Sequence, residues 1–187
     1  MLRTDPFRDA PTLIRRVYAY AAYRLGDGPD AEDVTSETFE RGLRYRDSFD
    51  PLRGEPVAWL LGIARRCIAE ALATRSETVG EVPDTAGTLD LEDDAVRRVD
   101  LRTAVLQLDD RDRELIALRY GADLTARQIA ELLELKTNAV EVALHRALAR
   151  LRERLERRGD EEDEEASFGG RAAPPRVRPL GSDGSAG

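Results

Sequence analysis

The sequence contains few of the residues that most often carry catalysis or bind metals. Among its 187 residues there is one cysteine, Cys67, and one histidine, His145. A single cysteine forms no internal disulfide, and the apolar residues around it indicate a buried small hydrophobe. The sequence also lacks a Gly-rich phosphate loop and any cluster with metal-ligand spacing. We therefore expect a protein that is not an enzyme and that has no cofactor, no metal and no small-molecule substrate.

Long apolar runs are absent as well. No stretch approaches the roughly 18 apolar residues that a membrane-spanning helix needs. The N-terminal sequence MLRTDPFRDAP lacks the apolar core of a secretory signal. No segment shows the two-residue alternation of a β-strand. The sequence thus predicts an all-α, cytoplasmic protein without direct membrane insertion.

The net charge of −8 argues against a nucleic-acid partner until it is divided along the chain. Residues 76–100 carry a net charge of −6 and residues 159–187 a net charge of −4. Residues 1–75 are neutral, and residues 101–158 carry a net charge of +2. The excess of acidic residues therefore lies outside the segments with helical patterning. Residues 101–158, which are mildly basic, remain a candidate for binding DNA.

Apolar residues recur at helical spacing in three segments of the first half, residues 12–25, 31–45 and 57–73. Gly26 follows the first segment as a helix stop, and Asp30 precedes the second as an expected N-cap. The third segment is apolar on most faces and should form the centre of the packing. We expect these helices to build one small domain over residues 7–75.

The helical pattern stops at residues 76–100, where Pro, Gly, Thr and acidic residues indicate a flexible acidic linker. It resumes at residue 101 and continues to residue 158, which predicts a second small helical domain. Residues 159–187 begin with a block of acidic residues and continue with Gly, Pro, Ala and Ser. Such a composition predicts a disordered C-terminal tail.

The second domain contains the pattern of a helix-turn-helix. Thr125 and Gln128 have the spacing of a capping box, and Asn138 and Glu141 repeat that spacing at a second helix start. Glu134 occupies the turn position where a left-handed backbone favours Gly. Acidic Glu141 on a DNA-reading helix would repel phosphate, so we interpret it as the partner of Asn138 in a cap. Two short helices with such a turn also occur in bundles that do not bind DNA, and this alternative stays open.

Taken together, both halves of the chain resemble RNA polymerase sigma factors of the sigma-70 family, in the extracytoplasmic-function (ECF) group. The matching stretches are LGDGPDAEDVTSETFERGLRYRDSFDP, AWLLGIARR, LDDRDRELIALRY, LTARQIAELL and VEVALHRALARLRERL. The resemblance implies a transcription initiation factor that binds core RNA polymerase and promoter DNA. It assigns opening at the −10 element to the first domain and the −35 element to the second. An anti-sigma factor is a further partner that the family suggests.

The resemblance also implies three sets of contact residues. The polymerase-binding set is Glu32, Asp33, Glu37 and Arg41. The set for the −10 element is Arg53, Trp59, Arg65 and Arg66, of which Trp59 can instead be a core residue. The set for the −35 element is Thr125, Arg127, Gln128, Lys136, Thr137, Asn138, Glu141, His145 and Arg146. The chain departs from the family at Glu141 and Ala143, where basic residues are common.

Two other functions remain open from the sequence. A helix-turn-helix regulator acting without polymerase accounts for residues 125–150 but leaves the first 75 residues unexplained. A sigma-like protein that binds polymerase with reduced promoter reading is compatible with the departures in the second helix. Binding to core polymerase, measured together with promoter-dependent transcription, distinguishes the three.

Overall fold

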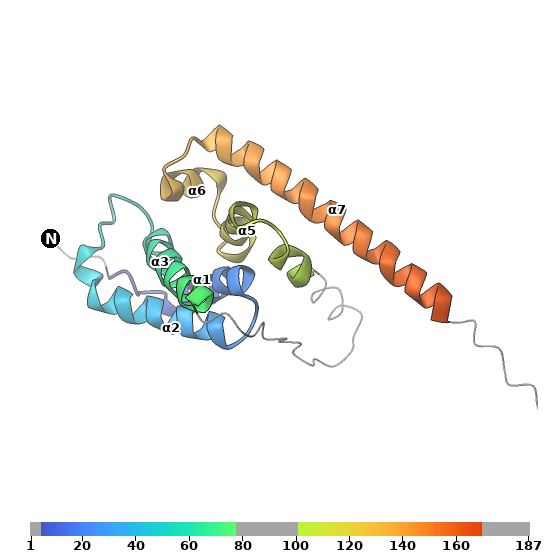
Figure 1. Cartoon of the computed structure of the whole chain (residues 1–187). Helices are drawn as coiled ribbons and strands as arrows, with labels where there is room; N and C mark the ends of the chain where they lie inside the picture. Colours follow the sequence, from blue (N-terminus) through green and yellow to red (C-terminus); the bar gives the residue numbers. More distant parts are fainter. Residues whose placement is uncertain (1–4, 78–100, 170–187) are drawn as a thin grey trace, which may run out of the picture. The chain divides into compact units, whose positions relative to one another are not determined.

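The computed structural model describes residues 5–77 and 101–169, and every regular element in these ranges is helical. The all-α prediction is therefore confirmed. The elements in chain order are α1 (Ala10–Leu25), α2 (Pro29–Arg44), the 3₁₀ turn η1 (Arg46–Ser48), α3 (Pro56–Glu77), α5 (Asp110–Ile116), the π turn η2 (Ala117–Gly121), α6 (Ala126–Leu133) and α7 (Thr137–Gly169) (Figure 1). Residues 101–106 form one further short helix. None of the described helices has the length and apolarity needed to cross a membrane.

The ends of α1 and α2 follow local sequence signals, with one correction. Gly26 ends α1 with a φ of 96°, a conformation that favours glycine, as predicted. The N-cap of α2 is Gly28 and not Asp30. Pro29 explains the earlier start, because its fixed φ and missing N–H suit the first turn of a helix. Asp30 then lies inside the first turn, where its charge favours the helix dipole.

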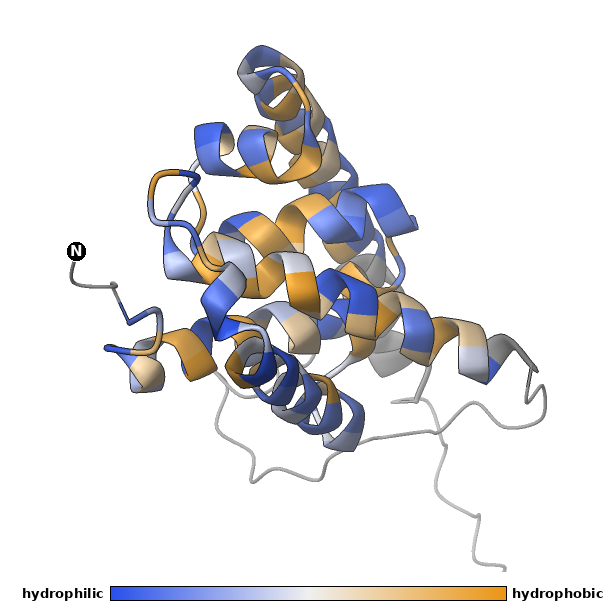
Figure 2. Ribbon diagram, turned by 90° about the vertical axis from the view of Figure 1, so that its left-hand side faces the viewer, coloured by the Kyte–Doolittle hydropathy of each residue, from blue (hydrophilic) through white to orange (hydrophobic). Residues whose placement is uncertain are grey.

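The described residues form two buried clusters, and both halves of the chain contribute to the larger one. Tyr20 of α1, Ile68 of α3, Leu118 of η2 and Ile129 of α6 are among its members. Orange, apolar residues accordingly gather where the helices face one another in Figure 2. Cys67 is a buried free thiol in this cluster, as predicted, and burial raises its pKa. Both predicted domain segments thus lie in one compact unit, residues 1–155.

Polar contacts also join α1 and α3 to the α5–η2 segment. The Tyr20 hydroxyl donates to the Glu114 carboxylate at 3.0 Å. Arg24 and Arg65 form ion pairs with Glu114 at 3.1 and 2.8 Å. Arg16 donates from Nε to the carbonyl of Ala122 at 2.6 Å. The buried carboxylate of Glu114 therefore connects elements about 50 to 90 residues apart in sequence.

The predicted linker and tail lie mostly outside the described residues. Helix α3 extends to Glu77, and residues 78–100 and 170–187 are not described. At the other boundary the backbone of α7 stays helical to Gly169, beyond the predicted domain end at residue 158. The many Glu residues after residue 160 are good helix formers, which accounts for the longer helix.

Candidate nucleic-acid interface

Helices α6 and α7 and the turn between them form the predicted helix-turn-helix. The Thr125 hydroxyl accepts from the backbone N–H of Gln128, and the Gln128 side chain accepts from the backbone N–H of Thr125. The capping box is therefore confirmed. Glu134 has a left-handed backbone with a φ of 56°, also as predicted. Val140 is fully buried and anchors α7 against the rest of the motif.

The second predicted cap, between Asn138 and Glu141, is wrong. Helix α7 begins at Thr137, and the backbone N–H of Val140 already donates to the carbonyl of Lys136. Asn138 is therefore inside the first turn, where it cannot act as the residue before the helix. The left-handed turn at Glu134 brings the chain into helical geometry earlier than the side-chain pattern suggested. Glu141 is left as an exposed acidic residue on the outer face of α7.

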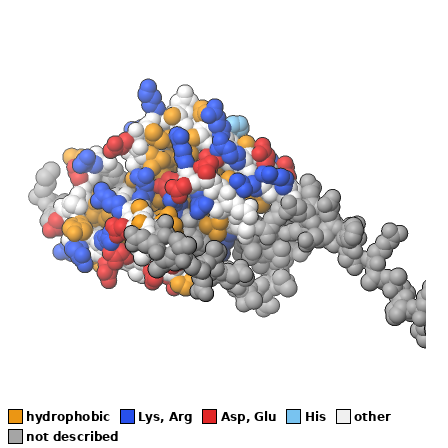
Figure 3. Space-filling model, viewed as in Figure 1, with side chains coloured by type: hydrophobic (Ala, Val, Ile, Leu, Met, Phe, Trp, Pro, Cys, Tyr) orange, Lys and Arg blue, Asp and Glu red, His pale blue; other side chains and the backbone are white. Residues whose placement is uncertain are grey.

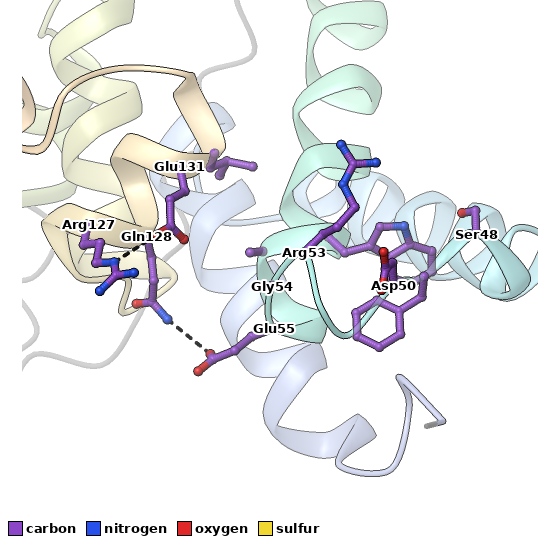
Figure 4. Close-up of a pocket in the computed structure, with 12 residues that line it drawn as sticks. Ser48, Asp50, Arg53, Gly54, Glu55, Arg127, Gln128 and Glu131 are labelled. Atoms are coloured by element: carbon purple, nitrogen blue, oxygen red, sulfur yellow. Dashed lines mark hydrogen bonds and ion pairs between the residues drawn. The ribbon is translucent and has the colours of Figure 1, made fainter. Parts of the chain in front are cut away.

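The loop between η1 and α3 encloses a pocket of about 450 Å³ together with α6 (Figure 4). Asp50 organises the loop, because its side chain accepts from the backbone N–H of Leu52 at 3.0 Å. Leu52 is 94% exposed at the tip of the loop. Arg53 and Arg127 both line the pocket. With Trp59 and Gln128, which also line it, the pocket brings two residues predicted for the −10 element close to two predicted for the −35 element.

The same pocket is bridged by a hydrogen bond between the two halves. The Gln128 amide donates to the Glu55 carboxylate at 3.2 Å, and Arg127 pairs with Glu131 at 3.0 Å (Figure 4). The pocket wall therefore has both acidic and basic groups. Gly54, with a φ of 149°, lets the loop turn into α3 at this point.

Trp59 packs partly against the core and partly faces the pocket. Its ring packs against Phe49, with centroids 5.6 Å apart, and against Phe7 at 6.2 Å. The side chain is half-buried against the main core and also lines the 450 Å³ pocket. Because the ring is only partly buried, part of it is open to an aromatic contact from the pocket.

The remaining residues predicted as contacts in the first domain differ in exposure and in ion pairing. Arg66 is exposed, whereas Arg65 is engaged by Glu114. On α2, Glu32 and Asp33 are exposed. The guanidinium of the predicted polymerase contact Arg41 is already held by two carboxylates.

Arg41 forms ion pairs with Glu37 at 2.5 Å and with Glu70 of α3 at 2.7 Å. These hydrogen bonds, with Glu70 contributing most, raise the pKa of Arg41, and the bond from Arg41 lowers the pKa of Glu70. Because the positive charge of Arg41 is balanced by two carboxylates, the face around it is acidic overall.

The outer face of α7 separates two shallow grooves. We call the first the Lys136 groove; it measures about 610 Å³, and its lining residues include Lys136, Asn138, Val142, Arg146, Arg111 and Arg150. We call the second the His145 groove; it measures about 350 Å³, and its lining residues include Thr125, Glu141, His145, Arg119 and Tyr120. The predicted −35 set is therefore divided. Arg127 and Gln128 line the 450 Å³ pocket beside the loop before α3, and most of the other residues lie on α7 or next to it.

Three arginines of these grooves were missed by reasoning from sequence. Arg150 lies four residues after Arg146, so helical spacing could have placed both on one face. Arg111 of α5 and Arg119 of η2 come from other elements, and no local pattern indicates that they lie beside α7. The space-filling view shows Lys and Arg side chains around the exposed histidine, with acidic side chains interspersed (Figure 3).

No three His, Cys, Asp or Glu side chains within the described ranges lie close enough to hold a metal ion. The two grooves place cationic and hydrogen-bonding groups on both sides of α7. That arrangement fits a helix inserted into the major groove of duplex DNA, with flanking cations near the phosphates.

Comparison with solved structures supports the fold. The sigma factor RpoE in complex with the anti-sigma factor NepR, from Bartonella quintana, aligns with a TM-score of 0.61 and 22% identity, over 80% of this chain and 95% of that one. The structure of CnrH in complex with the cytosolic domain of CnrY aligns with a TM-score of 0.53 and 25% identity, over 80% and 83% of the two chains.

Sequence comparison identifies the family. Residues 12–78 match the family model for sigma-70 region 2, and residues 98–151 match the model for sigma-70 region 4. The ECF RNA polymerase sigma factor SigD of Mycobacterium tuberculosis is 34% identical over 163 residues, which cover 77% of this chain and 74% of SigD. SigW of Bacillus subtilis is 27% identical over 81% of this chain and 89% of its own length. BldN of Streptomyces coelicolor is 32% identical over 72% of this chain, which spans only 54% of BldN. The chain therefore belongs to the ECF group of RNA polymerase sigma factors in the sigma-70 family.

Proposed function

We propose that this chain is a transcription initiation factor that binds core RNA polymerase and directs it to promoters, with DNA opening at the −10 element. The observation that carries the proposal is the presence of both sigma regions, in order, with the helix-turn-helix formed in the second. A regulator acting without polymerase would leave the match over residues 12–78 without a role.

We assign the functions to the two halves as the sequence suggested. Residues 7–75 would contact polymerase and the −10 element, and residues 101–158 would contact the −35 element, with residues 76–100 as the connection. The exposed acidic residues Glu32 and Asp33 of α2 present a surface complementary to a basic partner helix.

For the −10 element we propose the loop before α3 as the contact region. Arg53 supplies a cation, and the half-buried ring of Trp59 supplies a stacking surface for an unpaired base. Arg66 is exposed for a phosphate contact, whereas Arg65 must first leave Glu114. Single-stranded DNA is bound by this combination of cations and aromatic faces.

For the −35 element we propose α7 as the recognition helix. The predicted contacts Lys136, Thr137, Asn138, His145 and Arg146 are all exposed on it. The structure adds Arg150 on the same helix, and Arg111 and Arg119 beside it. The action proposed is binding and not catalysis, and it would take place in the cytoplasm, where bacterial promoters are transcribed. An anti-sigma factor is a further proposed partner, as found for RpoE of Bartonella quintana.

Transcription with purified components tests the proposal. The full chain plus core polymerase should give promoter-dependent transcripts from a genomic fragment library, and core polymerase alone should not. Binding to core polymerase without initiation on any fragment would indicate a sigma-like protein with reduced promoter reading. Absence of both binding and initiation would reject the sigma function.

The Arg146→Ala variant tests the recognition helix within the same assay. Loss of one phosphate contact should weaken promoter binding and lower the slope of log K against log salt by about one unit. Arg152→Ala is the matched control, because Arg152 is an exposed arginine of the same helix that lines neither groove. An unchanged slope in Arg146→Ala would remove this residue from the DNA contacts.

A further inference from the structure

Two residues at the centre of the outer face of α7 are unsuited to binding phosphate. Glu141 is exposed, and its carboxylate has no hydrogen-bond or ion-pair partner among the described residues. Val142 is 45% exposed, although it is apolar and the core residue Val140 lies two positions away.

The groups on both sides of these residues are cationic. Lys136 and Arg146 lie on the Lys136 groove and have no carboxylate partner within the described part of the chain. The carboxylates of that groove already accept hydrogen bonds within the protein: Asp109 caps α5, and Asp112 accepts from Arg150. The Lys136 groove is therefore more positive toward an incoming ligand than its composition suggests.

The His145 groove, on the other side, contains Arg119 and His145 beside Glu141. Arg119 is fixed by a hydrogen bond to the carbonyl of Leu124 at 2.9 Å and lies over the Tyr120 ring at 5.9 Å from its centroid. If α7 enters the major groove, cations on its two sides approach the two phosphate backbones. Glu141 and Val142 then face the base edges between them.

The base edges in the major groove limit what each side chain can recognise. A carboxylate only accepts hydrogen bonds, and the amino group of cytosine is the donor that Glu pairs with there. An exposed apolar side chain finds an apolar partner only in the methyl group of thymine. Consecutive residues of a helix are separated by about 1.5 Å along the axis and by about 100° around it, so Glu141 and Val142 are directed at different base edges.

We infer that Glu141 and Val142 determine the specificity of the −35 contact, Glu141 by accepting from the amino group of a cytosine and Val142 by contacting a thymine methyl in a neighbouring base pair. This inference rests on the proposed function and specifies which bases of the −35 element the second domain recognises. It also explains why an acidic residue is tolerated on this helix: the carboxylate is directed at a base donor, and the phosphates are left to the flanking cations.

A barcoded promoter library, randomised over the −35 element and transcribed by core polymerase with the full chain, provides the first test. The wild type should select templates with a cytosine and a neighbouring thymine, with about a tenfold preference for the cytosine. Glu141→Ala should lose the cytosine preference and keep the thymine preference. Glu153→Ala is the matched control, because it removes an acidic residue from the same helix but outside both grooves, and its base preferences should equal those of the wild type.

The thymine contact is tested by removing a single methyl group from the DNA. Replacing that thymine by deoxyuridine should weaken binding of the wild-type holoenzyme about threefold to fivefold, the effect of losing one buried methyl. Val142→Ala should bind both templates equally. An equal methyl effect in wild type and Val142→Ala would overturn this contact.

The outcomes separate the inference from the proposed function. If the wild type initiates but Glu141→Ala keeps the same cytosine preference, the specificity inference is wrong and the sigma function stands. If Glu141→Ala merely strengthens binding to every template equally, Glu141 acts only by repelling phosphate, which also overturns the inference. If the wild type initiates on no template, the proposed function fails and the inference fails with it.

Discussion

At the scale of single residues, Gly121 lies closer to another backbone segment than any other described glycine. A Cβ atom added at this position would lie 2.9 Å from the carbonyl oxygen of Ala19, which belongs to the backbone of α1 and cannot turn away. Gly121 ends the π turn, so the absence of a side chain there lets α1 and η2 approach closely. No local sequence pattern indicates this close approach.

Gly121→Ala should therefore lower the free energy of unfolding by about 1–3 kcal/mol, the usual cost of overpacking. Gly62→Ala is the matched control. Its added Cβ would lie 3.9 Å from a Leu132 methyl, and alanine is favoured over glycine inside α3, so this variant should gain about 0.5–1 kcal/mol. Urea denaturation measures both values, and equal stability of the two variants would contradict the close approach at Gly121.

At the scale of elements, the turn of the helix-turn-helix stores strain at Glu134. Its left-handed backbone, with φ 56° and ψ 41°, is unfavourable for a residue with a side chain. The turn is nevertheless closed by a hydrogen bond from the Leu135 N–H to the carbonyl of Ala130 at 2.9 Å. Burial of Val140 and Ile129 around the turn offsets the strain.

Replacing Glu134 by glycine should raise the free energy of unfolding by about 1 kcal/mol, because the left-handed penalty disappears. The same replacement at Glu131, inside α6, should lower it by about 1 kcal/mol. Thermal unfolding followed by circular dichroism compares the two. A loss of stability in Glu134→Gly would show that the turn is not strained in solution.

At the scale of the whole molecule, Glu114 holds the compact unit together. Its side chain is 13% exposed and accepts from Tyr20, Arg24 and Arg65. Arg24 is itself only 7% exposed and pairs with Asp110 as well. A buried charge depends on its partners, because an unpaired ion in the protein interior is costly.

Glu114→Ala should accordingly lower the free energy of unfolding by about 3 kcal/mol, since it leaves two arginines without their shared carboxylate. Glu131→Ala removes a carboxylate from an exposed pair with Arg127 and should change stability by less than about 1 kcal/mol. Denaturant titrations of both variants check the difference. Similar small effects would mean that the Glu114 cluster contributes little to joining the segments.

The sequence by itself determined the local features of this protein. Helical spacing predicts the segments that became α1, α2 and α3. The capping box at Thr125 follows from residue type and spacing, and the left-handed turn at Glu134 follows from its position in the motif. The resemblance to the sigma-70 family was also detectable from the sequence, because the matching motifs are contiguous stretches. The predicted cap at Asn138 failed because local spacing does not reveal where burial of Val140 makes the helix begin.

Only the tertiary structure decided which distant residues meet. Arg111 and Arg119 border the recognition helix, and Glu114 binds residues of α1 and α3, although no pattern within a single segment indicates these contacts. The exposure of Glu141 and Val142 also became clear only when the start of α7 was fixed. The physical reason is that helix signals act over a few residues, whereas charge neighbours and buried contacts depend on how helices far apart in the chain pack together.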